Sequence, residues 1–267
     1  MLKKIWIIIL TLGFVSTVKA EEIKIVGSTT VLPIAQKTAE VFMRKHPDIK
    51  ITVGGGGSGV GIASLIDGTC DIADSSRSMK PKEIQTAKGK GIDPRANVVA
   101  LDGIAVIIHP SNNISALTRQ QVKDIYTGKI SNWSQLGGQN AKIVVVSRDS
   151  ASGTFEAFNE LALEGAKVRQ DALMQASNQA IATTVAQTPT SIGYVGIGYL
   201  SESVKAVAID GIYPSKKTVL SKEYKYARPL FMYTNGEPKG AVKKYIDFVT
   251  SKEGQTIVEE IGFIGLK

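Results

Sequence analysis

The chain has 267 residues, of which 32 are basic and 24 acidic, so its formal net charge is +8 at pH 7. Without the three lysines of its first twenty residues, 29 basic residues stand against 24 acidic ones, a net of +5. The basic residues form only small clusters, for example over 80–95 and 216–228, and we expect no nucleic-acid partner.

The first twenty residues have the layout of a secretory signal peptide. Lys3 and Lys4 precede an apolar run over residues 5–15, and a small residue, Ala20, ends the pattern. The run is too short for a comfortable membrane span. We therefore expect residues 1–20 to be cleaved off after Ala20 and the mature chain to be exported.

From residue 22 onward, short apolar strands alternate with amphipathic helices. The predicted elements are a strand over 23–26, a helix from 31 to His46, a strand over 49–53, a helix over 60–66, a strand over 71–73 and a helix after Pro81. Such an alternation is typical of right-handed βαβ units on a largely parallel sheet. Cys70 is the only cysteine, so no internal disulfide is possible, and we expect it to be a small packed residue.

The second part of the chain repeats this alternation. Its predicted elements are a buried strand over 104–108, a helix around 122–126, a strand over 143–146, helices over 153–163 and 178–187, strands over 192–195 and 230–233, a helix over 242–249 and another after 251. Two α/β lobes fit this pattern better than one long sheet. We expect lobe I over 21–103, lobe II over 104–227, and a return to lobe I over 228–267, with crossing segments near 102–108 and 228–233.

Three turns contain the same kinds of hydrogen-bond donors, and each lies between a predicted strand and the helix that follows it. They are Gly27-Ser28-Thr29-Thr30, Gly57-Ser58-Gly59 and Ser152-Gly153-Thr154, the last preceded by Arg148. Hydroxyls, glycine backbone N–H groups and helix N-termini all favour an anion. Together with a guanidinium, they predict a pocket for a small tetrahedral oxyanion.

Each turn also has another interpretation, and the glycine-rich one could be a plain turn. Serine and threonine are ordinary helix caps, which would account for the first and third turns. Gly54, Gly56 and Gly59 match the spacing of a dinucleotide-binding loop, with Asp74 at a suitable distance for a ribose. An exported protein meets little dinucleotide, so a loop that lets the backbone approach a compact anion is the favoured reading.

Two further segments extend the candidate site. Ser76 ends a predicted strand and offers another hydroxyl donor, while the neighbouring Arg77 is expected to pair with Asp74. Arg148 presents a planar fork that matches two oxyanion oxygens. Asp149 is expected to pair with the guanidinium of Arg148 and to hold it in position.

Catalytic and metal-binding patterns are missing from the sequence. Both histidines precede prolines, His46 before Pro47 and His109 before Pro110, and they look like the ends of elements. There is no metal-ligand cluster, nucleophile elbow or triad spacing. We therefore expect a binding protein that needs no cofactor and is not an enzyme.

The chain closely resembles the periplasmic phosphate-binding proteins of the phosphate ABC transporter. The resemblance covers nearly the whole mature chain and rests on the three turns and on further motifs. These are Asp71–Arg77, Ile130-Ser131-Asn132-Trp133, Arg148–Thr154 and Ser191–Val195. It implies an α/β type II periplasmic-binding-protein fold of two lobes, with phosphate in the cleft, a membrane permease as partner and a monomeric chain.

The resemblance also implies roles for individual residues. Ser28 and Asp149 would support the site without touching the ligand. The residues expected to contact phosphate are Thr29, Thr30, Ser58 and Ser76 from lobe I, and Arg148, Ser152, Gly153 and Thr154 from lobe II.

Some family members have an aspartate where Ser76 stands, and it accepts the proton of hydrogen phosphate. A serine there weakens the argument for rejecting sulfate. A receptor for sulfate, molybdate or tungstate therefore stays open as an alternative. A secreted phosphohydrolase that uses the same anion site is a second alternative.

Overall fold

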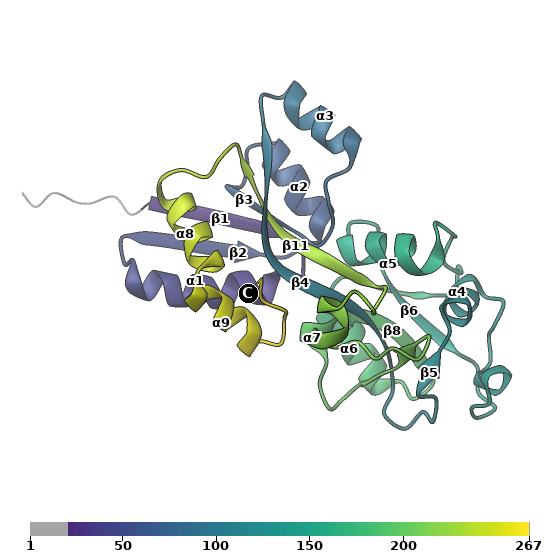
Figure 1. Ribbon diagram of the computed structural model, residues 1–267. Coiled ribbons are helices and arrows are strands. Elements are labelled where there is room, and N and C mark those ends of the chain that lie inside the picture. The colour runs from purple at the N-terminus through teal and green to yellow at the C-terminus, as the bar shows by residue number, and fades with distance from the viewer. Residues whose placement is uncertain (1–20, 267) are drawn as a thin grey trace, which may run out of the picture.

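The computed structural model describes residues 21–266. The predicted signal peptide, with its cleavage after Ala20, lies outside the described residues. Figure 1 shows two groups of helices and strands, connected by two long neighbouring strands. We call the group near the N-terminus lobe I and the other lobe II.

Lobe I is built on strands in the order β2-β1-β3-β11. Strand β1 pairs in parallel with β2 and with β3, whereas β11 pairs with β3 in the antiparallel direction. Its elements are β1 (Glu21–Gly27), α1 (Leu32–Lys45), β2 (Ile49–Gly54), α2 (Ser58–Ile66), β3 (Ile72–Ser75), α3 (Pro81–Gly89), β11 (Ala227–Asn235), α8 (Gly240–Thr250) and α9 (Lys252–Glu260).

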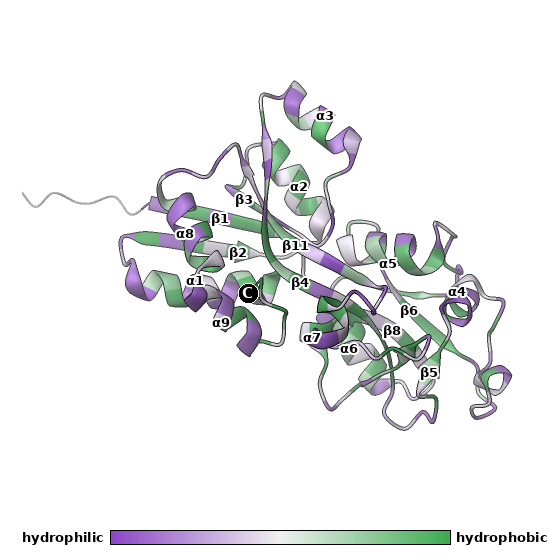
Figure 2. Ribbon diagram, viewed as in Figure 1, coloured by the Kyte–Doolittle hydropathy of each residue, from purple (hydrophilic) through white to green (hydrophobic). Residues whose placement is uncertain are grey.

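Two apolar clusters hold helices on lobe I. Residues of α1, α8 and α9 pack with β1 and β2 in one cluster, which includes Phe42, Tyr245 and Val258. A smaller cluster joins α2 and α3 to the sheet through Ile62 and Ala87. Figure 2 shows the apolar colour along the strands and the polar colour on the outer helix surfaces, as amphipathic helices require.

Lobe II continues the sheet in the order β8-β6-β7, with β6 parallel to both neighbours. Its core surrounds the fully buried Trp133 and Phe158. Its elements are β5 (Ala116–Leu117), α4 (Arg119–Thr127), η1 (Trp133–Leu136), β6 (Val144–Arg148), α5 (Gly153–Leu163), β7 (Leu173–Gln175), α6 (Asn178–Gln187), β8 (Ser191–Gly196), η2 (Ile197–Tyr199), β9 (Lys205–Ala206), β10 (Ala208–Ile209) and α7 (Lys216–Leu220).

The strand β4 (Pro94–Ile108) connects the lobes. It pairs with β11 up to Gly103 and with β8 from Ile104 onward, both in the antiparallel direction. The sequence analysis predicted only residues 104–108 of it, which form a continuous apolar run, because residues 94–103 mix polar and apolar side chains. The exact lobe boundaries at 103/104 and 227/228 stay a prediction.

Most predicted elements are present, and helices α5 and α6 have the predicted bounds. The sequence pattern missed β5, β7, β9, β10 and α7, which have only two to five residues each. A period of hydrophobicity cannot be read from so few positions. Within residues 21–266, no helix is both long and apolar enough to cross a membrane.

Candidate functional site

The first predicted turn follows β1 and is ordered by Ser28. Its Oγ accepts hydrogen bonds from the backbone N–H groups of Thr30 (3.1 Å) and Val31 (3.4 Å). Its own N–H donates to the carbonyl of Asp74 on β3 at 2.8 Å. Ser28 thus caps the turn that leads into α1, in the supporting position that the resemblance implies.

The second turn brings the backbones of the two lobes into contact. Gly57 has φ +99°, and a Cβ there would lie 2.5 Å from the carbonyl oxygen of Ala151 in lobe II. Two residues later, the N–H of Gly59 donates to that same carbonyl at 2.9 Å. Glycine is required at position 57 both by its backbone conformation and by this close approach.

Ser58 and Ser76 form a hydroxyl pair that faces α5. Their Oγ atoms are 3.3 Å apart, and Ser58 Oγ accepts from the N–H of Ser76 at 3.0 Å. A Cβ on Gly153 would lie 2.2 Å from Ser58 Oγ and 2.9 Å from Ser76 Oγ. The predicted donors of α2, β3 and α5 therefore converge at one point, although they come from both lobes.

The third turn opens α5. Ser152 Oγ accepts from the N–H of Phe155 at 3.1 Å, so this serine is the helix cap. The N–H groups of Gly153 and Thr154 belong to the first helical turn, whose donors have no partner within the helix. They are the part of the helix that is suited to an anion.

Arg148 ends β6 and is almost completely buried. Its Nε donates to the carbonyl of Gln175 at 3.0 Å and its Nη2 to that of Ala176 at 2.9 Å. Its Nη1 has no hydrogen-bond partner among the described residues. Burial lowers the pKa of Arg148, and the nearby charge of Arg228 also lowers it. A buried guanidinium with an unpartnered N–H group can form a charged hydrogen bond to an anion, which is stronger than a neutral one.

Two predicted ion pairs are wrong. Asp149 does not hold the guanidinium of Arg148, since its Oδ1 accepts from the N–H of Ala151 at 2.8 Å and carbonyls hold the arginine instead. Arg77 does not pair with Asp74. It binds Glu83 with two nitrogens and lies 2.5 Å from Glu156 Oε2, which belongs to α5 of lobe II.

Asn178 is a functional residue that the sequence analysis missed. It is the first residue of α6, and its Nδ2 donates to the hydroxyls of Thr29 (3.1 Å) and Thr30 (3.0 Å) in lobe I. Its Oδ1 accepts from the N–H of Gly196. An amide directly after the capping Ser177, at a helix start that the sequence did predict, was the available signal.

A buried ion pair between the crossing strands was missed as well. Arg228 on β11 donates to Asp102 on β4 through Nε (3.0 Å) and Nη2 (2.8 Å). Burial raises the pKa of Asp102, and the arginine opposes that rise. Arg228 also reaches the carbonyl of Gly153 and the hydroxyls of Thr30 and Thr154. Opposite charges in the two predicted crossing segments were the signal for this pair.

The hydroxyls of Thr30 and Thr154 meet between the lobes, 2.8 Å apart. Nearby, the Tyr199 hydroxyl donates to the carbonyl of Thr29 at 2.5 Å. The structure thus brings the predicted residues of both lobes together, but it engages Thr30 with other side chains instead of leaving it free.

Asp74 lies fully buried on β3, next to the first turn. Neither of its carboxyl oxygens has a hydrogen-bond partner among the described residues. Burial raises its pKa well above the usual range for aspartate, so the neutral form is favoured.

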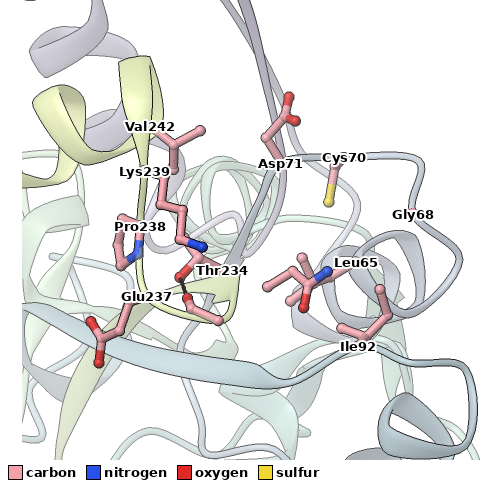
Figure 3. A pocket seen from close by; sticks show the side chains of 12 residues that line it. Leu65, Gly68, Cys70, Asp71, Ile92, Thr234, Glu237, Pro238, Lys239 and Val242 are labelled. Atoms are coloured by element: carbon pink, nitrogen blue, oxygen red, sulfur yellow. Dashed lines mark hydrogen bonds between the residues drawn. The ribbon is translucent and has the colours of Figure 1, made fainter.

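A separate pocket of about 400 Å³ lies at the other end of the lobe I strands (Figure 3). Cys70 and Asp71 border it before β3 begins, and Thr234 borders it near the end of β11. It shares no residue with the convergence point of the three turns. Cys70 is buried, as expected of a packed residue. Residues 21–266 contain no group of three or more histidine, cysteine or acidic side chains arranged for a metal ion.

Comparisons with known proteins agree with this architecture. Residues 15–253 match the model of a PBP superfamily domain. The chain is 35% identical over 257 residues to the phosphate-binding protein PstS of Borreliella burgdorferi, covering 92% of this chain and 90% of the relative. It is 36% identical to PstS of Bacillus subtilis, covering 89% and 78%.

Solved structures give the same result. One from Clostridium perfringens, described as a phosphate ABC transporter substrate-binding protein with bound phosphate, has a TM-score of 0.86 and 38% identity, covering 92% of this chain and all of that one. An ABC-type phosphate transport receptor from Vibrio cholerae has a TM-score of 0.75 and 32% identity, covering 91% and 99%. The chain therefore belongs to the PBP superfamily, in the family of the PstS phosphate-binding proteins, and has its two-lobed type II fold.

Proposed function

We propose that this protein captures inorganic phosphate between its two lobes and delivers it to the permease of an ABC transporter. The proposed ligand residues are Thr29, Thr30, Ser58, Ser76, Arg148, Ser152, Gly153 and Thr154. The family relation supports both the ligand and the transporter as partner. The signal-peptide pattern supports an exported, periplasmic chain, and we expect it to act as a monomer and to catalyse no reaction.

One observation carries the proposal: Arg148 is buried, its Nη1 has no hydrogen-bond partner among the described residues, and its Nη2 binds the carbonyl that directly precedes the cap of α6. Arg148 is anchored on the carbonyl of Ala176, two residues before the Asn178 that contacts Thr29 and Thr30. A tetrahedral anion next to Nη1 of Arg148 would accept hydrogen bonds from this nitrogen and from the hydroxyls and N–H groups of the proposed ligand residues. Water is excluded, so the charged hydrogen bonds gain strength.

Binding is coupled to closure of the lobes. Lobe I contributes the hydroxyls of Ser58 and Ser76, and lobe II contributes Arg148 and the first turn of α5. Phosphate docks on one set, and closure adds the other, with β4 and β11 as the connecting strands. The closed form would then be the one that the permease recognises.

Titration calorimetry with phosphate tests the proposal on wild-type protein and on Arg148→Ala. Charged hydrogen bonds contribute about 1.5–3 kcal/mol each, so the variant should bind about 10- to 150-fold more weakly for each such bond that it loses. Arg119→Ala, on an exposed part of α4, is the matched control and should bind like wild type. Unchanged affinity in Arg148→Ala, with an unchanged melting temperature, would remove this arginine from the site.

Competition between phosphate and sulfate, molybdate or tungstate tests the choice of ligand. Phosphate should displace each of the others from the wild-type protein at lower concentration. Preference for one of the other oxyanions would reassign the substrate while keeping the site. Hydrolysis of a chromogenic phosphate ester that disappears in Arg148→Ala would instead show a phosphohydrolase.

A further inference from the structure

The hydroxyls of Thr30 and Thr154 are surrounded by donors. Asn178 Nδ2 donates to Thr30 Oγ1 at 3.0 Å, and Arg228 Nη2 approaches Thr154 Oγ1 at 3.0 Å and Thr30 Oγ1 at 3.3 Å. A guanidinium can only donate. The amide is oriented as a donor because its Oδ1 accepts from the Gly196 N–H.

The lone pairs and protons of the Thr30 and Thr154 hydroxyls determine which hydrogen bonds remain for a ligand. Two hydroxyl oxygens have four acceptor positions. Asn178 donates to one of these positions on Thr30, and Arg228 donates to one position on each threonine. The hydrogen bond between the two hydroxyls occupies the fourth position. Of the two hydroxyl protons, one lies in that mutual bond, so one is left. Neither hydroxyl has another protein partner in the described chain, and both residues are buried.

We propose that Asn178 and Arg228 are positioning residues that make the Thr30–Thr154 pair a pure donor, so that only an unprotonated ligand oxygen can face it. This inference rests on the proposed phosphate site. Asp102 fixes the role of Arg228, because its Oδ2 holds both Nε and Nη2. The second hydrogen of Nη2 is thereby directed toward the two threonines.

The hydroxyl pair of Ser58 and Ser76 differs from the threonine pair because it still has free acceptor positions. Ser58 Oγ accepts from the Ser76 N–H, and the two hydroxyls are in contact at 3.3 Å. Two of their four acceptor positions are therefore free. A protonated phosphate oxygen finds an acceptor at Ser58 and Ser76 and none at Thr30 and Thr154. The two sides of the site thus sort the oxygens of hydrogen phosphate, although no carboxylate replaces Ser76.

Phosphate binding at two pH values tests this sorting, at about pH 8.5 for hydrogen phosphate and about pH 5.5 for dihydrogen phosphate. The wild type should bind more weakly at the lower pH, because dihydrogen phosphate has two protonated oxygens and only the serine pair can accept from them. Asn178→Leu removes one donor and frees an acceptor position on Thr30. It also removes the bonds to Thr29 and from the Gly196 N–H, so it should bind at least about tenfold more weakly at high pH. It should also lose at least about half of the pH effect on a logarithmic scale.

Gln179→Leu, the next residue of α6, is the matched control and should keep the wild-type pH effect. The charged groups that face the threonine pair, Arg228 with Asp102 and the nearby Arg148, are common to all variants and cancel in the comparison. Thr30→Val is a second variant should Asn178→Leu fold poorly, since it frees an acceptor position on Thr154. It too should reduce the pH effect.

An unchanged pH effect in both variants would overturn the inference even if phosphate binds tightly. Failure of the wild type to bind phosphate at either pH would instead overturn the proposed function. Melting temperatures measured without ligand separate a folding defect from a binding defect.

Discussion

At Gly153, the start of α5 in lobe II lies close to two serines of lobe I. Replacing this glycine with alanine would place a Cβ 2.2 Å from Ser58 Oγ and 2.9 Å from Ser76 Oγ. Overpacking of this kind costs about 1–3 kcal/mol, and here it opposes only the closed form. We expect Gly153→Ala to bind phosphate about 10–100-fold more weakly by calorimetry. Gly89→Ala, where a Cβ meets nothing within 4 Å, is the control, and equal affinity of both variants would contradict the steric argument.

At this scale the sequence predicted which residue types gather but not how they are connected. The hydroxyls, the glycine and Arg148 were found because strand ends and helix starts can be read from local patterns. Their partners could not be found in this way: Asn178 lies 148 residues from Thr30, and Arg228 lies 126 residues from Asp102. The assignment of Asp149 to Arg148 failed because adjacency in sequence does not set side-chain direction. Asp149 lies just after β6, where its Oδ1 accepts from the N–H of Ala151 in the turn before α5.

Strand β3 contains a group whose ionisation should affect the stability of lobe I. Burial without a partner raises the pKa of Asp74 far above its unfolded value. The folded state then binds a proton that the unfolded state releases. This contribution to stability is complete below the unfolded pKa, about 3.9, and declines as the pH rises toward the folded value.

Asp74→Asn removes this titration while keeping the shape of the side chain. The difference in unfolding free energy, variant minus wild type, should therefore increase as the pH rises from about 4 to about 7, by at most about 1.4 kcal/mol per pH unit. Denaturant unfolding at several pH values measures it, and the constant cost of burying an amide does not alter the slope. Asp48→Asn, at an exposed position, should show no comparable trend. A pH-independent difference at Asp74 would mean that its carboxyl is not neutral in the fold.

The elements that the sequence placed well are those with a full amphipathic or apolar period, such as α5, α6 and the second half of β4. The first half of β4 was missed because its side chains do not alternate. It is a strand because nine residues of β11 provide it with hydrogen-bonding partners. That long antiparallel pair connects the lobes, so the connection on which closure depends could be located only approximately.

For the molecule as a whole, a set of charges spans the two lobes beside the site. Arg77 and Lys80 of lobe I lie 2.5 and 3.0 Å from Glu156 Oε2 on α5 of lobe II. Arg77 is also held by Glu83, so it is already positioned when the lobes approach. None of these side chains is among the proposed ligand residues. The ion pairs should therefore stabilise the closed form without contributing to recognition of the anion.

Glu156→Gln should accordingly weaken phosphate binding only moderately. The pair with Lys80 is partly exposed and contributes about 1 kcal/mol or less, and Arg77 keeps its two bonds to Glu83, so we expect a loss of up to about fivefold. The loss should shrink at high salt, because screening already weakens the pair in the wild type. Glu160→Gln lies one turn further along α5 and is exposed, so it serves as the control. Since lobe closure is the step affected, small-angle scattering at partial saturation should show a larger radius for Glu156→Gln than for wild type. A loss of the size expected for Arg148→Ala would instead place Glu156 among the residues that hold the ligand.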